Sequence, residues 1–557
     1  MPSPTQSSAK SSNADYPLAI RQVINWGFTK WSQRRIRRLD SMNVADVQHK
    51  TLLKLVRMGA NTQFGLDHGF GNIKSLADFR RQTPLRNYDD YWRDYLQNSI
   101  QDTTNLLWPE PTTYFALSSG TTAGTTKFLP INRRLLKSNR LAGMTTLAFH
   151  LAAHPRSPMF TGKFFMLGGS TEMRRLSQVL NSSGSVTPQS TVSGKIANDR
   201  PESVVGHDVW SGDLSGIVAR ETPKWLRPFA FPPPEIALMS DWEKKLTELA
   251  ERSVRLPITL ISGVPSWLLV LFDRLKQLTG KSCIADIWPT LQLVIHGGTS
   301  FAPYREVFRE VLGDDRIKTL ETYPASEAFV ATEDPRSGLL RLVPDHKIFF
   351  EFVPLEELDQ DNPARHAIDE VELNVNYAVV LTTCAGLWSY VIGDTVMFVS
   401  RDPLQLRFTG RTKYFLSAFG EHLICEEVDR AIVAAASSVG ASVREYHVGP
   451  EFPEATDQVG RHQFFVEFES EMQEFNRFTT ELDRELSRIN EDYAAHRSGD
   501  LTMRSPQINV VSTGGFAQWM KSKGKLGGQH KVPRLDNSGS LTKELGAWFL
   551  QQKLLKN

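Results

Sequence analysis

Apolar and polar residues alternate with the spacing of amphipathic helices from about Pro17 to Leu96. One face of a helix repeats every 3.6 residues, so this spacing predicts a helical start to the folded chain. The stretch contains basic runs such as "KWSQRRIRRLD". Such a run is typical of a solvated helix face, although a nucleic-acid or membrane surface would also accept it.

Short apolar runs then alternate with longer periodic ones. "KFFMLGG" (163–169) and "LQLVIHGG" (291–298) predict buried strands that lead into turns. "VPSWLLVLFDRLKQLTG" (264–280) predicts a helix that ends at Gly280. "HKIFFEFVP" and "VELNVNYAVVLTT" predict further strands. The alternation of strands and helices predicts an α/β fold with large sheets.

The pattern changes near "RDPLQLRFTGRTKYF" (401–415). Beyond it come the predicted helices "LICEEVDRAIVAAASSVG" and "MQEFNRFTTELDRELSRIN", with the strands "REYHVGP", "HQFFVEFE" and "QINVVST" around them. We therefore expect a disordered tail at 1–16 and a large N-terminal domain of packed β-sheets flanked by helices at 17–408. A small α+β C-terminal domain follows at 409–557.

Composition narrows the class of protein. The 64 Lys and Arg nearly balance the 62 Asp and Glu, so the net charge of +2 gives no electrostatic case for nucleic acid. The three cysteines lie far apart, which argues against disulfide or metal spacing and fits a reducing compartment. No apolar run nears 18 residues, and the first 15 residues lack a secretory h-region. We expect a cytoplasmic protein without a membrane or nucleic-acid partner.

The stretch "YFALSSGTTAGTTKFLP" (114–130) carries the first candidate chemistry. Its hydroxyls, its flexible backbone and Lys127 are groups that bind a phosphate. The spacing differs from the P-loop pattern G-x-x-x-x-G-K-[ST], so γ-phosphoryl transfer loses support. A polar surface turn has the same composition, and this alternative stays open.

Four later motifs add candidate groups. In "ETYPASEAF" the Tyr323 ring can lie against a base, and Glu327 can hold a divalent cation. Asp394 in "GLWSYVIGD" can accept both hydroxyls of a ribose. Arg411 offers a fork of donors at the expected domain junction. "KSKGKLGGQHKVPRL" is a basic loop whose lysine could reach a phosphate in another domain. Each motif taken alone also fits a turn or a solvated loop.

In this order the motifs resemble the adenylate-forming superfamily, which includes acyl-CoA synthetases and firefly luciferase. "SSGTTAGTTKFLP", "TYPASEAF", "GLWSYVIGD" and "GGQHKVPRL" are similar, more narrowly, to the acyl acid amido synthetases, the auxin-responsive conjugating enzymes of plants and their bacterial relatives. The resemblance covers about residues 20 to 536. It implies an adenylation domain, a mobile C-terminal domain, ATP with Mg²⁺, and a small carboxylic acid and an amine or amino acid as substrates. We expect a monomer or a weak homo-oligomer.

The resemblance implies roles for the residues that contact phosphate. The phosphate loop matches Ser118, Ser119, Gly120 and Thr121. Lys127 matches the lysine that closes this loop, and Lys413 falls at the superfamily's hinge. Lys531 in "QHKVPR" matches the C-terminal lysine that touches the reacting carboxylate and the α-phosphate. Lys525 in "KGKLGG" competes for this role, and we favour Lys531.

It also implies roles for the residues around the nucleoside and the metal. Tyr323 matches the aromatic residue next to adenine, and Ser326 and Glu327 match the pair at the α-phosphate and Mg²⁺. Asp394 matches the ribose-binding aspartate, and Arg411 matches the arginine of the domain junction. Lys531, Glu327 and Lys127 are therefore the predicted catalytic residues.

This sequence departs from the plant members in the Gly-Asp motif. Where they carry the arginines of "GLYRYRVGD", this chain has Ser389 and Val391, so acyl and adenine recognition can differ. His296 in "VIHGG" is a candidate base for the attacking amine, although a histidine at a strand end is more often structural. Residues 168–216 could line the acyl or amine site. The alternatives are an acyl-CoA ligase and an ATP-binding regulator without catalysis; an architectural helical protein fits residues 17–96 alone.

Overall fold

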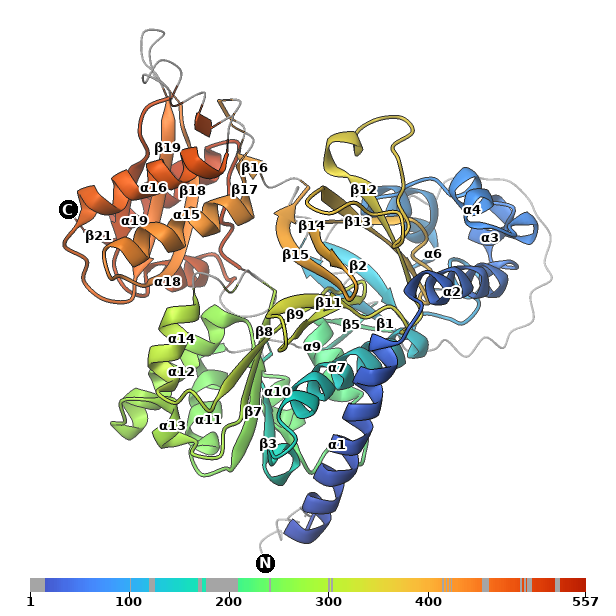
Figure 1. Ribbon diagram of the computed structural model, residues 1–557, viewed down its shortest axis with the longest axis horizontal. Helices are drawn as coiled ribbons and strands as arrows, with labels where there is room; N and C mark the ends of the chain where they lie inside the picture. Colours follow the sequence, from blue (N-terminus) through green and yellow to red (C-terminus); the bar gives the residue numbers. More distant parts are fainter. Residues whose placement is uncertain are drawn as a thin grey trace, which may run out of the picture.

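The computed structural model of the chain (Figure 1) describes residues 16–100, 102–119, 126–168, 173–176, 209–239, 242–298, 301, 304–412, 415–416, 418–419, 421, 423–452, 460–490, 493–494, 497, 503–525 and 531–556. The predicted tail at 1–16 lies outside these residues except for Tyr16. Within the described residues, no helix combines the length and the apolar character that a bilayer crossing requires.

The start of the chain is helical, as the spacing predicts. Its helices are α1 (Leu18–Asp40), α2 (Val44–Gly59), α3 (Gln63–Asp67), α4 (Leu76–Gln82), α5 (Tyr88–Tyr91) and α6 (Gln97–Ser99). The basic run of α1 divides into two groups. Arg35 is buried and forms a two-bonded ion pair with Asp345, whereas Arg34 and Arg37 are exposed. The solvated-face interpretation therefore holds for part of the run only.

An eleven-stranded sheet forms the centre of the molecule, in the order β12-β13-β14-β15-β11-β10-β9-β8-β7-β3-β6. Its parallel part consists of β3 (Lys163–Met166), β6 (Ala230–Phe231), β7 (Ile258–Gly263), β8 (Leu293–Gly297) and β9 (Lys318–Pro324). The antiparallel part consists of β10 (Phe329–Asp334), β11 (Leu339–Leu342), β12 (Ile348–Pro354), β13 (Asn376–Thr383), β14 (Tyr390–Arg401) and β15 (Leu404–Arg411). The α/β fold class with large sheets is confirmed.

Helices cover both faces of the parallel part (Figure 1). They are α7 (Arg133–Ala153), α9 (Leu214–Arg220), α10 (Pro234–Ala237), α11 (Trp242–Ser253), α12 (Pro265–Thr279), α13 (Ile284–Ile287) and α14 (Arg305–Leu312). Adjacent strand residues point to opposite faces, so Phe165 packs in the core with α11 to α14 and Phe164 packs in the core with α1 and α7. Gly280 ends α12 at φ 67°, as predicted from the sequence.

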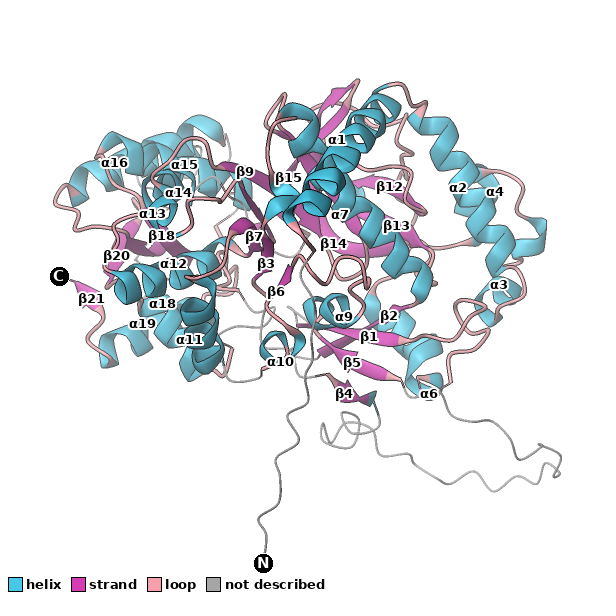
Figure 2. Cartoon of the chain, turned by 90° about the horizontal axis from the view of Figure 1, so that it is seen from below, coloured by secondary structure: helices cyan, strands magenta, loops and turns pink. Residues whose placement is uncertain are grey.

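A second, four-stranded sheet has the order β2-β1-β5-β4 (Figure 2). Its strands are β1 (Tyr114–Ser119), β2 (Thr126–Ile131), β4 (Arg174–Arg175) and β5 (Trp210–Gly212). Short 3₁₀ or π turns lie at Phe70–Asn72, Trp92–Leu96, Met159–Thr161 and Leu355–Glu357. Because β1 and β2 pair in antiparallel fashion, the two ends of the predicted phosphate loop lie side by side.

The C-terminal part has a sheet of its own with the order β18-β19-β20-β21. Its elements are β16 (Phe415–Leu416), β17 (Leu423–Ile424), α15 (Cys425–Ser438), β18 (Val443–Glu451), β19 (Arg461–Phe468), α16 (Phe475–Ile489), β20 (Gln507–Val511), α18 (Gly515–Ser522), α19 (Ser540–Gln551) and β21 (Leu555–Lys556). A separate apolar core joins α15 and α16 to this sheet. Strand β15 belongs to the large sheet as far as Arg411, which lies beyond the predicted boundary at 408/409. The position of this boundary remains a prediction.

Candidate active site

A cavity of about 1480 Å³ opens where the parallel strands end. Its wall includes the carboxyl ends of β3, β7, β8 and β9, together with residues of β14, β15 and the C-terminal part. In open α/β sheets this edge is the usual position of a ligand site. Pockets for a single small ligand measure roughly 300 to 1,000 Å³, so this cavity has room for more than one ligand.

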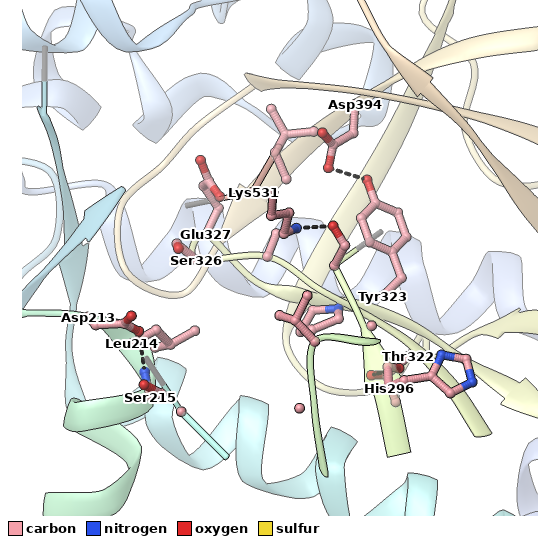
Figure 3. Close-up of a pocket in the computed structure, with 18 of the residues that line it drawn as sticks. Asp213, Leu214, Ser215, His296, Thr322, Tyr323, Ser326, Glu327, Asp394 and Lys531 are labelled. Carbon is pink, nitrogen blue, oxygen red and sulfur yellow. Dashed lines mark hydrogen bonds between the residues drawn. The ribbon is translucent and has the colours of Figure 1, made fainter. Parts of the chain in front are cut away.

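Three predicted nucleoside residues form one network on the cavity wall, and Figure 3 shows the bond between two of them, Tyr323 and Asp394. Asp394 of β14 accepts a hydrogen bond from Tyr323 Oη at 2.8 Å through Oδ2, and one from Arg411 Nε at 2.9 Å through Oδ1. Asp394 and Arg411 are register partners of β14 and β15. The Tyr323 ring is buried and lies edge-on to Phe408. The network therefore fixes the direction of the Asp394 carboxylate at a wall that a nucleoside can contact.

Ser326 and Glu327 follow β9 and lie on the opposite side of Lys531 from Tyr323 (Figure 3). The Glu327 carboxyl is buried, and Tyr390 Oη donates to its Oε1 at 3.3 Å. Burial raises the pKa of Glu327 above its usual value, and the positive charge of Lys127 opposes this shift. A cation bound beside this buried carboxyl group would stabilise its ionised form.

The first two residues of the predicted phosphate loop, Ser118 and Ser119, lie in strand β1 of the β1–β2 hairpin. Ser118 pairs with Lys127 in the strand register, and Ser119 pairs with Thr126. Gly120 and Thr121, like the hinge residue Lys413, lie outside the described residues. The Lys127 side chain lines the cavity, with its Nζ 5.7 Å from the centroid of the Tyr88 ring. The hairpin thus brings Lys127 to the cavity that Glu327 also lines.

Lys531 enters the cavity from the C-terminal part. Its Nζ donates to the carbonyl oxygen of Gly298, which follows β8 (Figure 3). The Lys531 side chain is exposed to the cavity. Desolvation, and then the charge of Arg411, lower the pKa of Lys531 to about 8. Lys525 also lines the cavity, and its side chain is exposed, as is that of Lys531. Of the two lysines, Lys531 is the one seen against the sheet edge.

His296 does not suit the role of a base. Its ring is buried and stacks on Phe301 with 3.5 Å between the ring centroids. Neither ring nitrogen has a hydrogen-bond partner among the described residues. Burial lowers the pKa of His296 to about 3, so the imidazole cannot hold a proton taken from an amine. Burial and stacking of the ring favour the structural interpretation of this histidine.

Several contacts at the site carried no recognisable signal in the sequence. Tyr390 and Tyr88 contact Glu327 and Lys127 from parts of the chain far from either. At the position where plant members carry an arginine, Ser389 Oγ accepts a hydrogen bond from Arg365 at 2.7 Å. A guanidinium from another loop therefore reaches this position. Contacts between residues far apart in the chain leave no recognisable pattern in the spacing of residues along the sequence.

Metal binding rests on few protein groups. Across the described ranges, no three His, Cys, Asp or Glu side chains converge as a ready-made metal cage. Mg²⁺ commonly takes only one or two carboxylates and completes its shell with substrate phosphates and water. The buried Glu327 carboxylate fits this mode of binding.

Comparison with known families decides the identity of the fold and the family. The sequence pattern of the GH3 family N-terminal domain matches residues 35–317, just over half of the chain. The chain belongs to the GH3 family. The GH3 family central domain matches residues 341–411, and the C-terminal domain matches residues 426–540. The membership expected from the motifs is thereby confirmed.

Relatives of this GH3 protein carry amido synthetase names. Jasmonoyl–L-amino acid synthetase GH3.5 of Oryza sativa subsp. japonica is 23% identical, with 89% of this chain and 93% of that protein covered. Indole-3-acetic acid-amido synthetase GH3.10 of Arabidopsis thaliana is also 23% identical, with the same two coverages of 89% and 93%. The similarity thus extends over nearly the whole length of both enzymes.

Two solved structures illustrate the fold that this chain shares. The GH3.15 acyl acid amido synthetase superposes with a TM-score of 0.73 at 16% identity, covering 94% of this chain and 96% of its own. A 2-hydroxyisobutyryl-CoA ligase in the postadenylation state gives a TM-score of 0.54 at 11% identity, covering 98% and 97%. The GH3 protein therefore has the fold of adenylate-forming ligases.

Proposed function

We propose that this protein is an ATP-dependent acyl acid amido synthetase. The observation that carries the proposal is the meeting of Lys531, Glu327 and the Tyr323–Asp394–Arg411 network on one cavity. The cavity has room for a nucleotide and an acyl acid together. The names of the GH3 relatives supply the reaction class, in which an acid is joined to an amino acid.

In the first half-reaction, a carboxylate oxygen of the acyl acid attacks the α-phosphorus of ATP, and the bond to pyrophosphate breaks. A carboxylic acid is already ionised at neutral pH, so this step needs no base. It needs cations, because an anion approaches a polyanion. Lys531, Lys127 and the β1–β2 loop would stabilise the developing charge. Mg²⁺ held by Glu327 would neutralise phosphate oxygens when bound.

The remaining roles concern orientation and the second half-reaction. Asp394 and Arg411 would hold the ribose, Tyr323 the adenine, and Ser326 the α-phosphate, with the phosphate loop Ser118–Thr121 on the departing pyrophosphate. An amine, most simply that of an amino acid, then attacks the acyl carbon and AMP leaves. We propose that residues 409–557 move between the two steps and withdraw Lys531 for the second.

A screen of carboxylic acids against acceptors tests the proposal. Pyrophosphate release and product mass are measured for each pair, with aromatic and aliphatic acids, the amino acids, and CoA. Pyrophosphate release with an amide product is the expected result. A thioester product would instead make this protein an acyl-CoA ligase, the reaction class of the more distant fold neighbour. ATP binding without pyrophosphate release from any acid would leave a regulator without catalysis.

We further propose a cytoplasmic enzyme that is a monomer or a weak homo-oligomer. Cys283, Cys384 and Cys425 are all free thiols, which fits a reducing compartment. The nearly neutral net charge of +2 gives no support for a nucleic-acid partner.

A further inference from the structure

A buried group of charged and aromatic side chains lies where the C-terminal part meets the large sheet. Its centre is Arg534, which follows Lys531 by three residues. Arg534 Nη1 donates to Asp429 Oδ1 of α15 at 2.8 Å, and its Nε lies 3.4 Å from Glu445 Oε1 of β18. Its carbonyl oxygen accepts from the backbone N–H of Val448 at 2.8 Å. Arg534 thus fixes the Lys531 segment to the core of the C-terminal part.

Two buried tyrosines enclose this arginine, one from each side of the interface. The Arg534 guanidinium carbon lies 5.5 Å from the ring centroid of Tyr304 and 4.8 Å from that of Tyr446. Tyr304 precedes α14 in the N-terminal part, and its hydroxyl donates across the interface to Glu445 Oε2 at 2.9 Å. Tyr446 of β18 donates to Asp429 Oδ1 at 2.6 Å, within the C-terminal part. The two tyrosines therefore make the same kind of bond, but only one bond crosses the interface.

We propose that Tyr304, Glu445 and Arg534 form an interdomain clasp that positions Lys531 for adenylation. The inference rests on the proposed function, because Lys531 matters only if this half-reaction occurs. The Tyr304–Glu445 bond exists only while the two parts are in contact; after they separate, water hydrates both groups. The clasp therefore stabilises the arrangement with Lys531 in the cavity and not the alternative one. Arg534 and Tyr304 are positioning residues, which act through Lys531.

The comparison of Tyr304→Phe with Tyr446→Phe tests the clasp. Both substitutions remove one hydroxyl from a buried bond to a carboxylate, so their local costs are matched. Tyr304→Phe removes the bond to Glu445 Oε2 only in the closed arrangement, while Glu445 Oε1 keeps its contact with Arg534 in both. A lost bond to a charged group corresponds to about a tenfold change in population. Tyr446→Phe affects both arrangements alike because its partner lies in the same part.

Three measurements are made on each full-length variant: carboxylate-dependent ATP–pyrophosphate exchange, aminolysis of a preformed acyl-adenylate, and the radius of gyration from X-ray scattering. Tyr304→Phe is expected to lower exchange about tenfold relative to Tyr446→Phe, to spare aminolysis, and to enlarge the molecule. Glu445→Gln, which weakens the same contact from the other side, replaces Tyr304→Phe if that variant does not fold.

The outcomes separate the clasp from the function on which it rests. Absence of exchange in the unmodified protein with every acid tested would refute the proposed function, and scattering alone would then decide whether the contact holds the parts together. Normal exchange in the unmodified protein, with equal exchange and equal size for the two tyrosine variants, would refute the clasp. Equal losses in both half-reactions for Tyr304→Phe would also refute it, since they indicate a general structural effect.

Discussion

Lys531 is the residue whose protonation state matters most directly for the proposed chemistry. It contacts the Gly298 carbonyl oxygen, and desolvation lowers its pKa to about 8. The ammonium is the protonated form, so the charge is present below this pKa and is lost as pH rises through it. A lysine in water titrates two units higher, so an alkaline limb near pH 8 would be specific to this environment.

We therefore expect kcat/KM for carboxylate-dependent ATP–pyrophosphate exchange to fall above about pH 8, because this ratio reports the free enzyme. Lys531→Arg keeps the charge to a much higher pH, so the limb should disappear even though the rate drops through altered geometry. Lys531→Ala should abolish exchange and spare aminolysis of a preformed acyl-adenylate. Persistence of the limb in Lys531→Arg would assign it to another group.

At the scale of elements, local signals predicted individual helices and strands but not their pairing. The glycine with positive φ that ends α12 is visible in the sequence as Gly280. The bond from Tyr323 to Asp394 joins β9 and β14, which have three strands between them in the sheet, and no spacing in the sequence reports this order. Motif resemblance predicted these two residues as parts of one site because it carries information about tertiary structure.

Two neighbouring glycines at the end of β8, Gly297 and Gly298, would meet different obstacles if a side chain were added. A Cβ on Gly297 would lie 2.4 Å from the backbone oxygen of Thr322, which cannot move without displacing β9. A Cβ on Gly298 would lie 2.7 Å from Lys531 Nζ, the mobile end of a side chain. The φ of Gly298 is +86°, so a side chain there also carries a backbone cost of about 1–2 kcal/mol.

Gly297→Ala should therefore lower the melting temperature, at a cost of about 1–3 kcal/mol from the forced shift of β9. Gly298→Ala should displace Lys531 and reduce pyrophosphate exchange by more than its smaller loss of stability explains. Thermal melting and exchange are measured on both variants. An equal ratio of lost exchange to lost stability in the two variants would contradict this assignment.

At the scale of the whole molecule, contacts of two kinds join the C-terminal part to the rest. The Tyr304–Glu445 bond is buried. By contrast, Lys521 reaches Glu243 at 2.5 Å at an exposed position, and Arg444 of β18 reaches Asp273 of α12 at 2.9 Å at a half-buried one. Exposed ion pairs typically contribute about 0–1 kcal/mol and are screened by salt, so the buried contact is expected to dominate.

Asp273→Asn tests this ranking of the interface contacts. Arg444 keeps its bond to Glu469 at 2.7 Å, so the variant removes a charge pair without leaving the guanidinium unpaired. We expect the rate of pyrophosphate exchange to fall by less than about threefold and the radius of gyration to change little. Raising the salt from about 0.1 to 1 M should have equally small effects on the rate and size of the unmodified protein. A loss of exchange as large as that of Tyr304→Phe, reproduced by high salt, would mean that the Arg444–Asp273 ion pair and not the Tyr304–Glu445 bond holds the two parts together.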